Sequence, residues 1–310
     1  MTNKTWTIRC CQLIGLVLLL VLCFNLYSNT RWRLEDGKSS SYKRMVSDER
    51  QQKTNFMVHH SPAFSNLILG SSRASYLPST QLSKLWFNYG TSGMYPDEYS
   101  GYIANAQQYA IDQKIDTILI GLDFWATTRA AIVIYDSPKV YLENATNFWI
   151  EEKKNLSLDL VKEGIKQVRL NISPKSNEAY YTFPFLIKNR TSSDVKEKDQ
   201  LVEGQLNYYK NDVYNNTYAF DSSYFSTLER LCSQFPSSTF IFYISPVSPP
   251  LDDIILSNGF AEKRHAWIQR LRLLRAKIIY VPSSNFSSDD FFDSHHLKPE
   301  CFAPILKQVR

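Results

Sequence analysis

Five short apolar runs, each followed by turn-forming residues, most strongly constrain how this chain of 310 residues can fold. Their apolar residues are continuous rather than alternating, which is typical of strands buried on both faces of a parallel sheet. The runs cover Asn66–Gly70, Lys84–Tyr89, Asp116–Gly121, Ser238–Ser245 and Lys277–Pro282. Helically spaced apolar residues lie between them. This alternation predicts an α/β fold, a three-layer sandwich around a five-stranded parallel sheet.

The N-terminus has a different character. Leu13–Phe24 is uninterrupted apolar sequence, and between Cys10 and Tyr27 only Gln12 and Asn25 are strongly polar. This length is close to the minimum that spans a bilayer, and no polar face marks a buried core helix. Because no small-x-small cleavage site follows, we favour an uncleaved membrane anchor over a signal peptide. We therefore expect residues 1–28 to form a short cytoplasmic tail and a membrane anchor.

The orientation of this anchor stays open in the sequence. Two basic residues precede the run and five follow it, which would place the C-terminal side inside the cell. Long domains can nevertheless cross a membrane regardless of such charges. Residues 29–55 are polar and are expected to form a stalk, whereas 56–310 are expected to form the folded domain.

A long insertion, at about 137–222, separates the third and fourth apolar runs. A segment of this length is usually a lid, a subdomain or a partner surface. It contains four clustered aromatic residues, Tyr180, Tyr181, Phe183 and Phe185. These rings either stack on sugars or pack the insertion against the domain.

Composition excludes some classes of function. The formal net charge is +5 on 35 basic and 30 acidic residues, with no basic stripe, so we expect no nucleic-acid partner. Cys232 and Cys301 lie outside the anchor and are either bonded or free. No Cys/His spacing indicates a metal site, and no cofactor is implied.

Two distant segments carry candidate chemistry. Ser72 follows the first apolar run and Gly70, where a strand passes into a helix, while Asp293 and His296 lie near the C-terminus. An Asp three residues before a His can orient the imidazole on one turn. If the fold joins the chain ends, these residues supply a nucleophile, a base and an orienting acid. The alternative for Ser72 is a helix N-cap, and for the histidines a surface pair.

The order of four short motifs resembles the GDSL/SGNH hydrolase superfamily. The motifs are Gly70-Ser71-Ser72, Asn88-Tyr89-Gly90-Thr91-Ser92-Gly93, Gly121-Leu122-Asp123-Phe124 and Asp293-Ser294-His295-His296. With the anchor and the insertion, the chain resembles the branch linked to O-acetylation of bacterial cell-surface polysaccharides. The resemblance implies a flavodoxin-like sheet, with Ser72 as nucleophile, His296 as base and Asp293 as its partner. It also implies an oxyanion donor at the backbone N–H of Gly93.

One position departs from this pattern. Asp123 stands where the superfamily has an Asn whose amide stabilises the oxyanion, and an ionised carboxylate would repel that charge. Asp123 is therefore protonated, or another donor serves, or hydrolysis is weak. Arg73, next to Ser72, either binds an acidic sugar, offsets Asp123 or forms a surface salt bridge.

The sequence thus predicts a membrane-anchored serine esterase or O-acyltransferase that acts on acyl esters, most simply acetyl esters, of a cell-surface polysaccharide. The expected location is the bacterial inner membrane, with the soluble part in the periplasm or outside the cell. A non-catalytic subunit that binds glycan or docks on a membrane O-acyltransferase is the alternative. A cytoplasm-facing hydrolase is a remoter one.

Overall fold

A computed structural model describes residues 3–35, 37–82, 85–129, 133–175, 177–183, 186–192, 195–215 and 217–309. Five parallel strands form the central sheet in the order β3-β2-β4-β7-β8. These are β2 (Asn66–Gly70), β3 (Trp86–Asn88), β4 (Thr117–Leu122), β7 (Thr239–Ile244) and β8 (Lys277–Tyr280). Each matches one of the apolar runs; Lys84, the expected start of the second strand, lies outside the described residues. The expected five-stranded parallel sheet is confirmed, and its strand order is the flavodoxin-like one.

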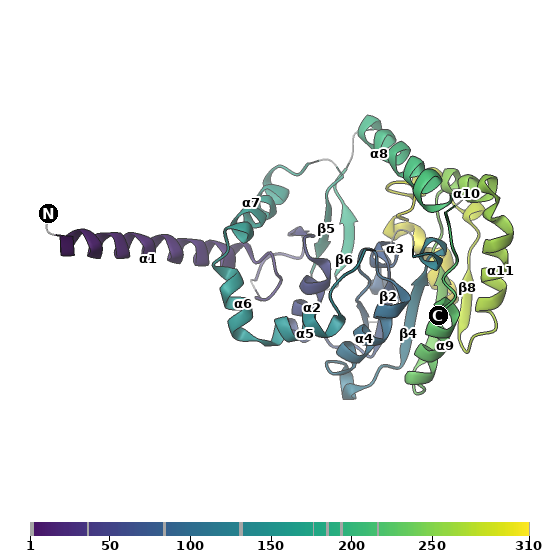
Figure 1. Ribbon diagram of the computed structural model, residues 1–310, viewed down its shortest axis with the longest axis horizontal. Coiled ribbons are helices and arrows are strands. Elements are labelled where there is room, and N and C mark those ends of the chain that lie inside the picture. Colours follow the sequence, from purple (N-terminus) through teal and green to yellow (C-terminus); the bar gives the residue numbers. More distant parts are fainter. Residues whose placement is uncertain are drawn as a thin grey trace.

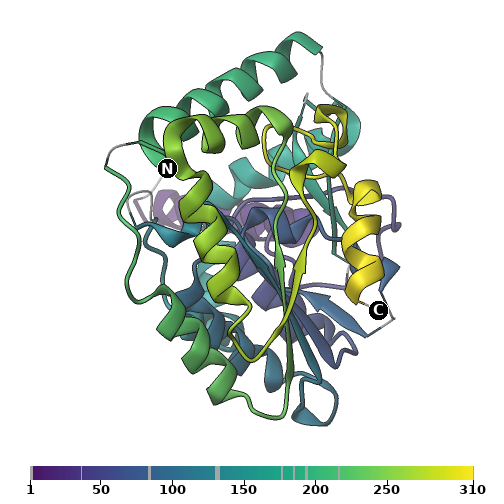
Figure 2. The ribbon, with the colours of Figure 1, turned by 90° about the vertical axis from the view of Figure 1, so that its right-hand side faces the viewer.

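Side chains of successive strand residues enter two separate cores. Leu67, Leu69 and Ile118 belong to one core, whereas Ile68 and Leu119 belong to the other. Helices cover both faces of the sheet (Figure 2), giving three layers. Packed against the first core are α4 (Pro96–Gln107), α9 (Tyr224–Gln234), α10 (Pro249–Ile255) and α11 (Ala261–Leu271). The second core is covered by α3 (Ser72–Ser75) and α12 (Ala303–Val309).

The N-terminal helix α1 (Asn3–Ser28) projects away from the rest of the molecule (Figure 1). Within its segment Lys4–Ser28, an 18-residue window has a mean hydropathy of 2.3. By length and composition, this is the one helix among the described residues that could cross a membrane. At about 1.5 Å per residue, 25 residues extend further than the ~30 Å hydrocarbon core of a bilayer.

Residues 29–55 do not form the expected stalk. Trp32 is fully buried, a short strand β1 (Arg44–Met45) joins a second sheet, and α2 (Glu49–His60) buries its polar residues. These side chains find partners inside the protein: Lys53 Nζ donates to the carbonyl of Gly90 over 2.6 Å. The polar composition suggested a solvated tether, but internal hydrogen bonds allow such residues to be buried.

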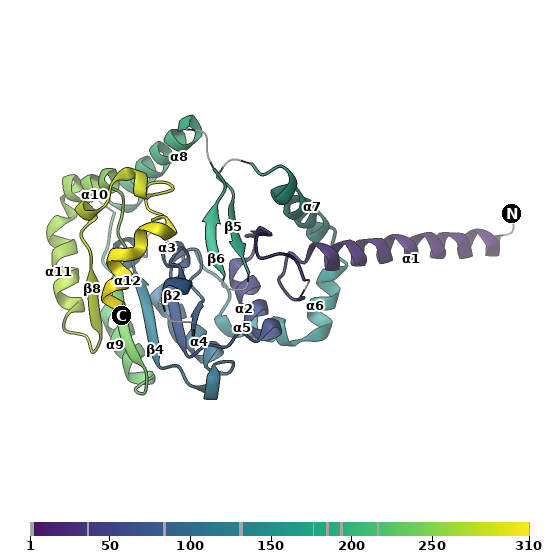
Figure 3. The same ribbon diagram turned by 180° about the vertical axis from the view of Figure 1, so that it is seen from behind.

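Between β4 and β7 the chain builds a separate layer. It contains α5 (Pro138–Thr146), α6 (Phe148–Asn155), α7 (Leu158–Ile172), β5 (Ala179–Thr182), β6 (Ile187–Arg190) and α8 (Val195–Tyr208). Strands β5 and β6 form an antiparallel hairpin, and β1 pairs with β5 to complete a three-stranded sheet. Seen from both sides (Figures 1 and 3), this sheet and α7 lie between α1 and the central sheet.

Candidate active site

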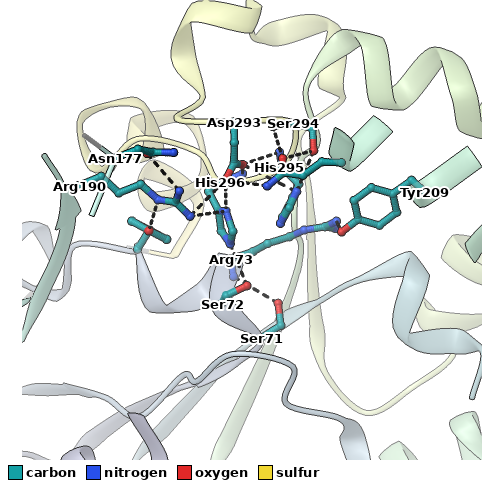
Figure 4. A network of polar contacts seen from close by, with 12 residues as sticks. Ser71, Ser72, Arg73, Asn177, Arg190, Tyr209, Asp293, Ser294, His295 and His296 are labelled. Carbon is teal, nitrogen blue, oxygen red and sulfur yellow. Dashed lines mark hydrogen bonds and ion pairs between the residues drawn. The ribbon is translucent and has the colours of Figure 1, made fainter. Parts of the chain in front are cut away.

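A tight turn at the end of β2 places Ser72 at the edge of the sheet. Gly70 has a φ of +130°, and a Cβ there would stand 2.6 Å from the carbonyl oxygen of Gly121, so only glycine fits. Ser71 is the N-cap of α3, its Oγ accepting from the N–H of Arg73. The capping role that was the alternative for Ser72 thus belongs to its neighbour. The Ser72 hydroxyl is left to point out of the turn (Figure 4).

Ser72, His296 and Asp293 form a continuous chain of contacts, although 224 positions separate the first two (Figure 4). His296 Nε2 lies 2.9 Å from Ser72 Oγ, and His296 Nδ1 lies 2.7 Å from Asp293 Oδ2. The second carboxylate oxygen of Asp293 accepts the backbone N–H of His296 over 2.9 Å. The carboxylate thereby fixes the ring, and a proton on Nδ1 leaves the Nε2 lone pair facing the serine hydroxyl.

The charges around this chain of contacts favour a neutral base. Burial lowers the pKa of His296 below its ordinary value, and the positive charges of Arg190 and Lys188 add to that, against the opposing pull of Asp293. Although burial opposes it, the imidazoles of His296 and His295 and the Arg190 guanidinium hold the pKa of Asp293 well below its usual range. An ionised Asp293 beside a neutral His296 is the state in which a Ser–His pair can accept the hydroxyl proton.

The insertion contributes a residue that the sequence analysis did not identify. Arg190, at the end of β6, places its guanidinium 3.2 Å from Asp293 Oδ2 and 3.3 Å from His296 Nδ1 (Figure 4). Tyr76 and Asn177 hold the guanidinium from the other side, at 2.7 and 3.1 Å. No motif marks Arg190, because Asp293 and His296 lie more than 100 positions away from it in the sequence.

His295 lies beside the triad but does not join it. Its Nδ1 contacts the hydroxyl of Ser294 over 2.9 Å and stays 3.8 Å from the nearer oxygen of Asp293. Gln205 on α8 binds Ser294 through its carbonyl oxygen, and its amide reaches Asp293 over 3.3 Å. Of the two histidines, His296 is the one whose ring contacts both Ser72 and Asp293.

Asp123 is buried in an ion pair, directly after β4. Its Oδ1 lies 3.1 Å from the Arg73 guanidinium, and Arg73 also donates to the Tyr209 hydroxyl over 3.0 Å. Side chains of Arg73 and Asp123 are 4% and 2% exposed, so this is not the surface salt bridge considered above. The guanidinium compensates the carboxylate charge, which corresponds to the expectation that Arg73 offsets Asp123. Burial of the charged head of Arg73 argues against a direct role in binding an acidic sugar.

Gly93 adopts a φ of +63° in the loop after β3, beside the Tyr135 ring. An internal charge cluster anchors this loop. Glu49 on α2 accepts the backbone N–H and the hydroxyl of Ser92, each over 2.8 Å, and its other oxygen binds Lys188 of β6 over 2.8 Å. Although burial opposes it, Lys188 and Lys53 lower the pKa of Glu49, which keeps it ionised. The β5–β6 hairpin thus contacts both the candidate triad, through Arg190, and the Gly93 loop, through Lys188 and Glu49.

Asp293, His295 and His296 are also the one group among the described residues whose ligand atoms lie close enough to hold a metal ion. The short contact between His296 Nδ1 and Asp293 Oδ2, at 2.7 Å, is that of a hydrogen bond. Two ligands of one zinc ion, each about 2.0 Å from the metal, would stand further apart in a tetrahedral site. The arrangement therefore fits a Ser–His–Asp triad better than a metal centre.

The insertion aromatics proposed for sugar stacking have other partners. Tyr181 is fully buried and donates to Glu49, while Phe183 packs on Trp32 and Phe56. Lys43 lies over the Tyr180 ring; Phe185 falls outside the described residues. Tyr181 and Phe183 therefore pack the insertion onto the domain.

Comparison with known proteins finds little. No protein-family model and no curated protein matches the sequence. Nine chains of solved structures match, and one of them is a protein from Streptococcus pneumonia described as a candidate platelet activating factor. The match covers 84% of this chain and 90% of that chain. The two are 12% identical with a TM-score of 0.36. So distant a likeness assigns neither a family nor an activity, and the function has to be inferred from the geometry of the site.

Proposed function

We propose that the chain is a membrane-anchored SGNH-type serine esterase or O-acyltransferase that acts on acyl esters of a cell-surface polysaccharide, most simply acetyl esters. The observation that carries the enzymatic part is the Ser72–His296–Asp293 chain of contacts at the C-terminal edge of a parallel sheet. This edge is where α/β folds of this kind bind their ligands. The polysaccharide is inferred from the sequence resemblance alone.

In the proposed reaction, the Ser72 hydroxyl gives its proton to His296 Nε2 while its oxygen bonds to the acyl carbonyl carbon. The tetrahedral intermediate collapses, its bond to the departing alkoxide breaks, and that oxygen takes the proton from Nε2. Water or a sugar hydroxyl then gives its proton to His296 Nε2 and attacks the acyl carbon. The bond to the Ser72 oxygen breaks, and that oxygen takes the proton back from Nε2. Asp293 stabilises the imidazolium each time. Water as acceptor gives an esterase, and a sugar hydroxyl gives a transferase.

Covalent labelling tests this proposal directly. The full chain in detergent is exposed briefly to p-nitrophenyl acetate and digested, and peptides are analysed by mass spectrometry. We expect one added acetyl group on the peptide that contains Ser72 and none in a Ser72→Ala variant. Ser71→Ala is the matched control, because it removes the neighbouring hydroxyl and should retain the label. An acetyl group that persists in Ser72→Ala would contradict the assignment.

The second candidate is a non-catalytic subunit, and one observation favours it. The carboxylate of Asp123 is tied to Arg73 at the position where the superfamily has its amide donor. Without that donor, oxyanion stabilisation depends on backbone N–H groups, and losing one donor costs roughly 10²–10³ in rate in a well-studied protease. A chain that binds acetylated polysaccharide but fails to label at Ser72 would support this candidate.

The charge of Arg190 should affect the pH dependence of kcat/KM. The pKa of His296 is lowered from 6.5, so the acid limb of the kcat/KM profile is expected below that pH. Arg190→Gln removes a positive charge beside the ring, which favours its protonated form, so the limb should move to higher pH. Arg190→Lys keeps the charge and should move it less. An unmoved limb in Arg190→Gln would show that another group controls it.

A further inference from the structure

Helix α7 carries an apolar stripe that the domain does not cover. Leu158, Val161, Ile165, Val168 and Ile172 recur at intervals of three and four residues, which aligns them along one helix face. Leu158, Ile165 and Ile172 are 67%, 58% and 79% exposed, so most of their apolar surface is uncovered in the described part of the chain. Soluble surfaces seldom keep such a contiguous apolar row, so a partner is expected.

The face of α7 next to this stripe packs on the end of α1 through Gly164. A Cβ added at Gly164 would lie 2.6 Å from the Phe24 ring and 2.8 Å from the Ser28 hydroxyl. The backbone of α7 therefore contacts these two side chains of α1 directly. The Asn25 amide donates to the carbonyls of Asn155 and Ser157, which precede α7. Phe24 ends the unbroken apolar run of α1. Helix α7 therefore crosses α1 where the apolar run ends.

This contact sets the depth of α7 relative to a bilayer. A hydrocarbon core about 30 Å thick takes up about 20 residues of α1. Centred on the apolar run Leu13–Phe24, these residues end near Ser28, so the boundary falls about one helical turn beyond Phe24, at the contact with α7. Helices α6 and α7 flank the point where α1 meets the domain, in both views (Figures 1 and 3). Trp149 in the first turn of α6 is 73% exposed, and tryptophan is enriched at the level of the lipid headgroups.

From this geometry we propose that α6 and α7 contact the membrane where α1 leaves the bilayer, with the α7 stripe and Trp149 inserted into the headgroup–acyl boundary. We call these two helices the collar. An amphipathic helix at this depth buries its apolar face about 5–10 Å into the boundary. Pairing with α7 of a second copy is less favourable, because the stripe spans only two heptads and coiled coils need three or four. The collar would hold the Ser72 site at a fixed height above the membrane.

Spin-label accessibility tests the collar in the full chain. All five cysteines are replaced by alanine, and a nitroxide is attached at Ile165→Cys, Ile172→Cys or Leu273→Cys. The last is a matched control, an exposed apolar position after α11 (84% exposed). The protein is reconstituted in vesicles of phosphatidylethanolamine and phosphatidylglycerol. The relaxation of the label is then measured with oxygen, which partitions into lipid, and separately with a water-soluble nickel chelate.

At 165 and 172 we expect relaxation by oxygen several-fold stronger than by nickel, and the reverse at 273. Stronger relaxation by nickel at 165 and 172 would place the stripe in water and overturn the proposal. Low accessibility to both, with dipolar broadening between labels, would show a second copy on the stripe and overturn it too.

A second experiment applies if the cysteine-free protein does not fold. The native chain is reconstituted in vesicles of brominated lipid, and quenching of tryptophan fluorescence should be weaker in Trp149→Phe than in wild type. Equal quenching in the two proteins would overturn the proposal.

Discussion

Replacing Ser72 with alanine is expected to lower ester turnover by about 10⁴-fold or more, because the nucleophile and its base act as one unit in serine hydrolases. His296→Ala should lower kcat to a similar extent, and the double variant should be little worse than either single one. The assay is hydrolysis of an activated acetyl ester by the detergent-solubilised full chain, followed over time. Circular dichroism should show an unchanged fold, since Ser71 and not Ser72 caps α3.

His295→Ala is the matched control for this series. His295 contacts Ser294, and its Nδ1 stays 3.8 Å from Asp293, so its loss should reduce turnover far less than loss of His296. A reversal, with His295→Ala the more severe change, would mean that the working base had been misassigned. Equal activity in Ser72→Ala and wild type would remove the triad altogether.

The central sheet could be predicted from sequence because its signal is local. Continuous apolar runs such as Asn66–Gly70 and Ser238–Ser245 can be buried on both faces only in a covered parallel sheet, and β2 and β7 match them closely. The candidate triad could be predicted for a related reason. Asp293 and His296 lie three residues apart, and motif order supplied the link to Ser72, which the structure brings to 2.9 Å from the histidine.

Two features that escaped prediction depend on long-range polar pairing. Residues of α2 have the composition of a solvated tether, but Glu49 is buried against Lys188, 139 positions away. Arg190 reaches Asp293 only because the β5–β6 hairpin folds across the sheet edge. The sequence around Glu49 or Arg190 does not indicate such a distant partner. Buried polar networks are specified by the whole fold, so local composition misplaces them.

Asp123→Asn is expected to destabilise the protein strongly rather than to improve the proposed oxyanion site. The substitution would supply the amide of the superfamily, but it leaves the Arg73 guanidinium, 4% exposed, without its carboxylate. Removing one partner of a buried ion pair typically costs about 3–5 kcal/mol. Because Arg73 directly follows Ser72, the turn that holds the nucleophile should loosen, and turnover should fall together with stability.

Urea unfolding of the solubilised chain, with turnover measured on the same samples, separates these effects. Asp123→Leu combined with Arg73→Met removes both charges and should recover part of the lost stability, since an apolar pair carries no uncompensated charge. Glu143→Gln, which breaks the exposed contact with Lys139, should leave the unfolding midpoint unchanged. A stable Asp123→Asn protein with higher turnover would show that the Arg73 ion pair is dispensable and that the missing amide alone had limited the reaction. Full stability with unchanged turnover would instead remove Asp123 from both the fold and the chemistry, and would leave backbone N–H groups as the source of oxyanion stabilisation.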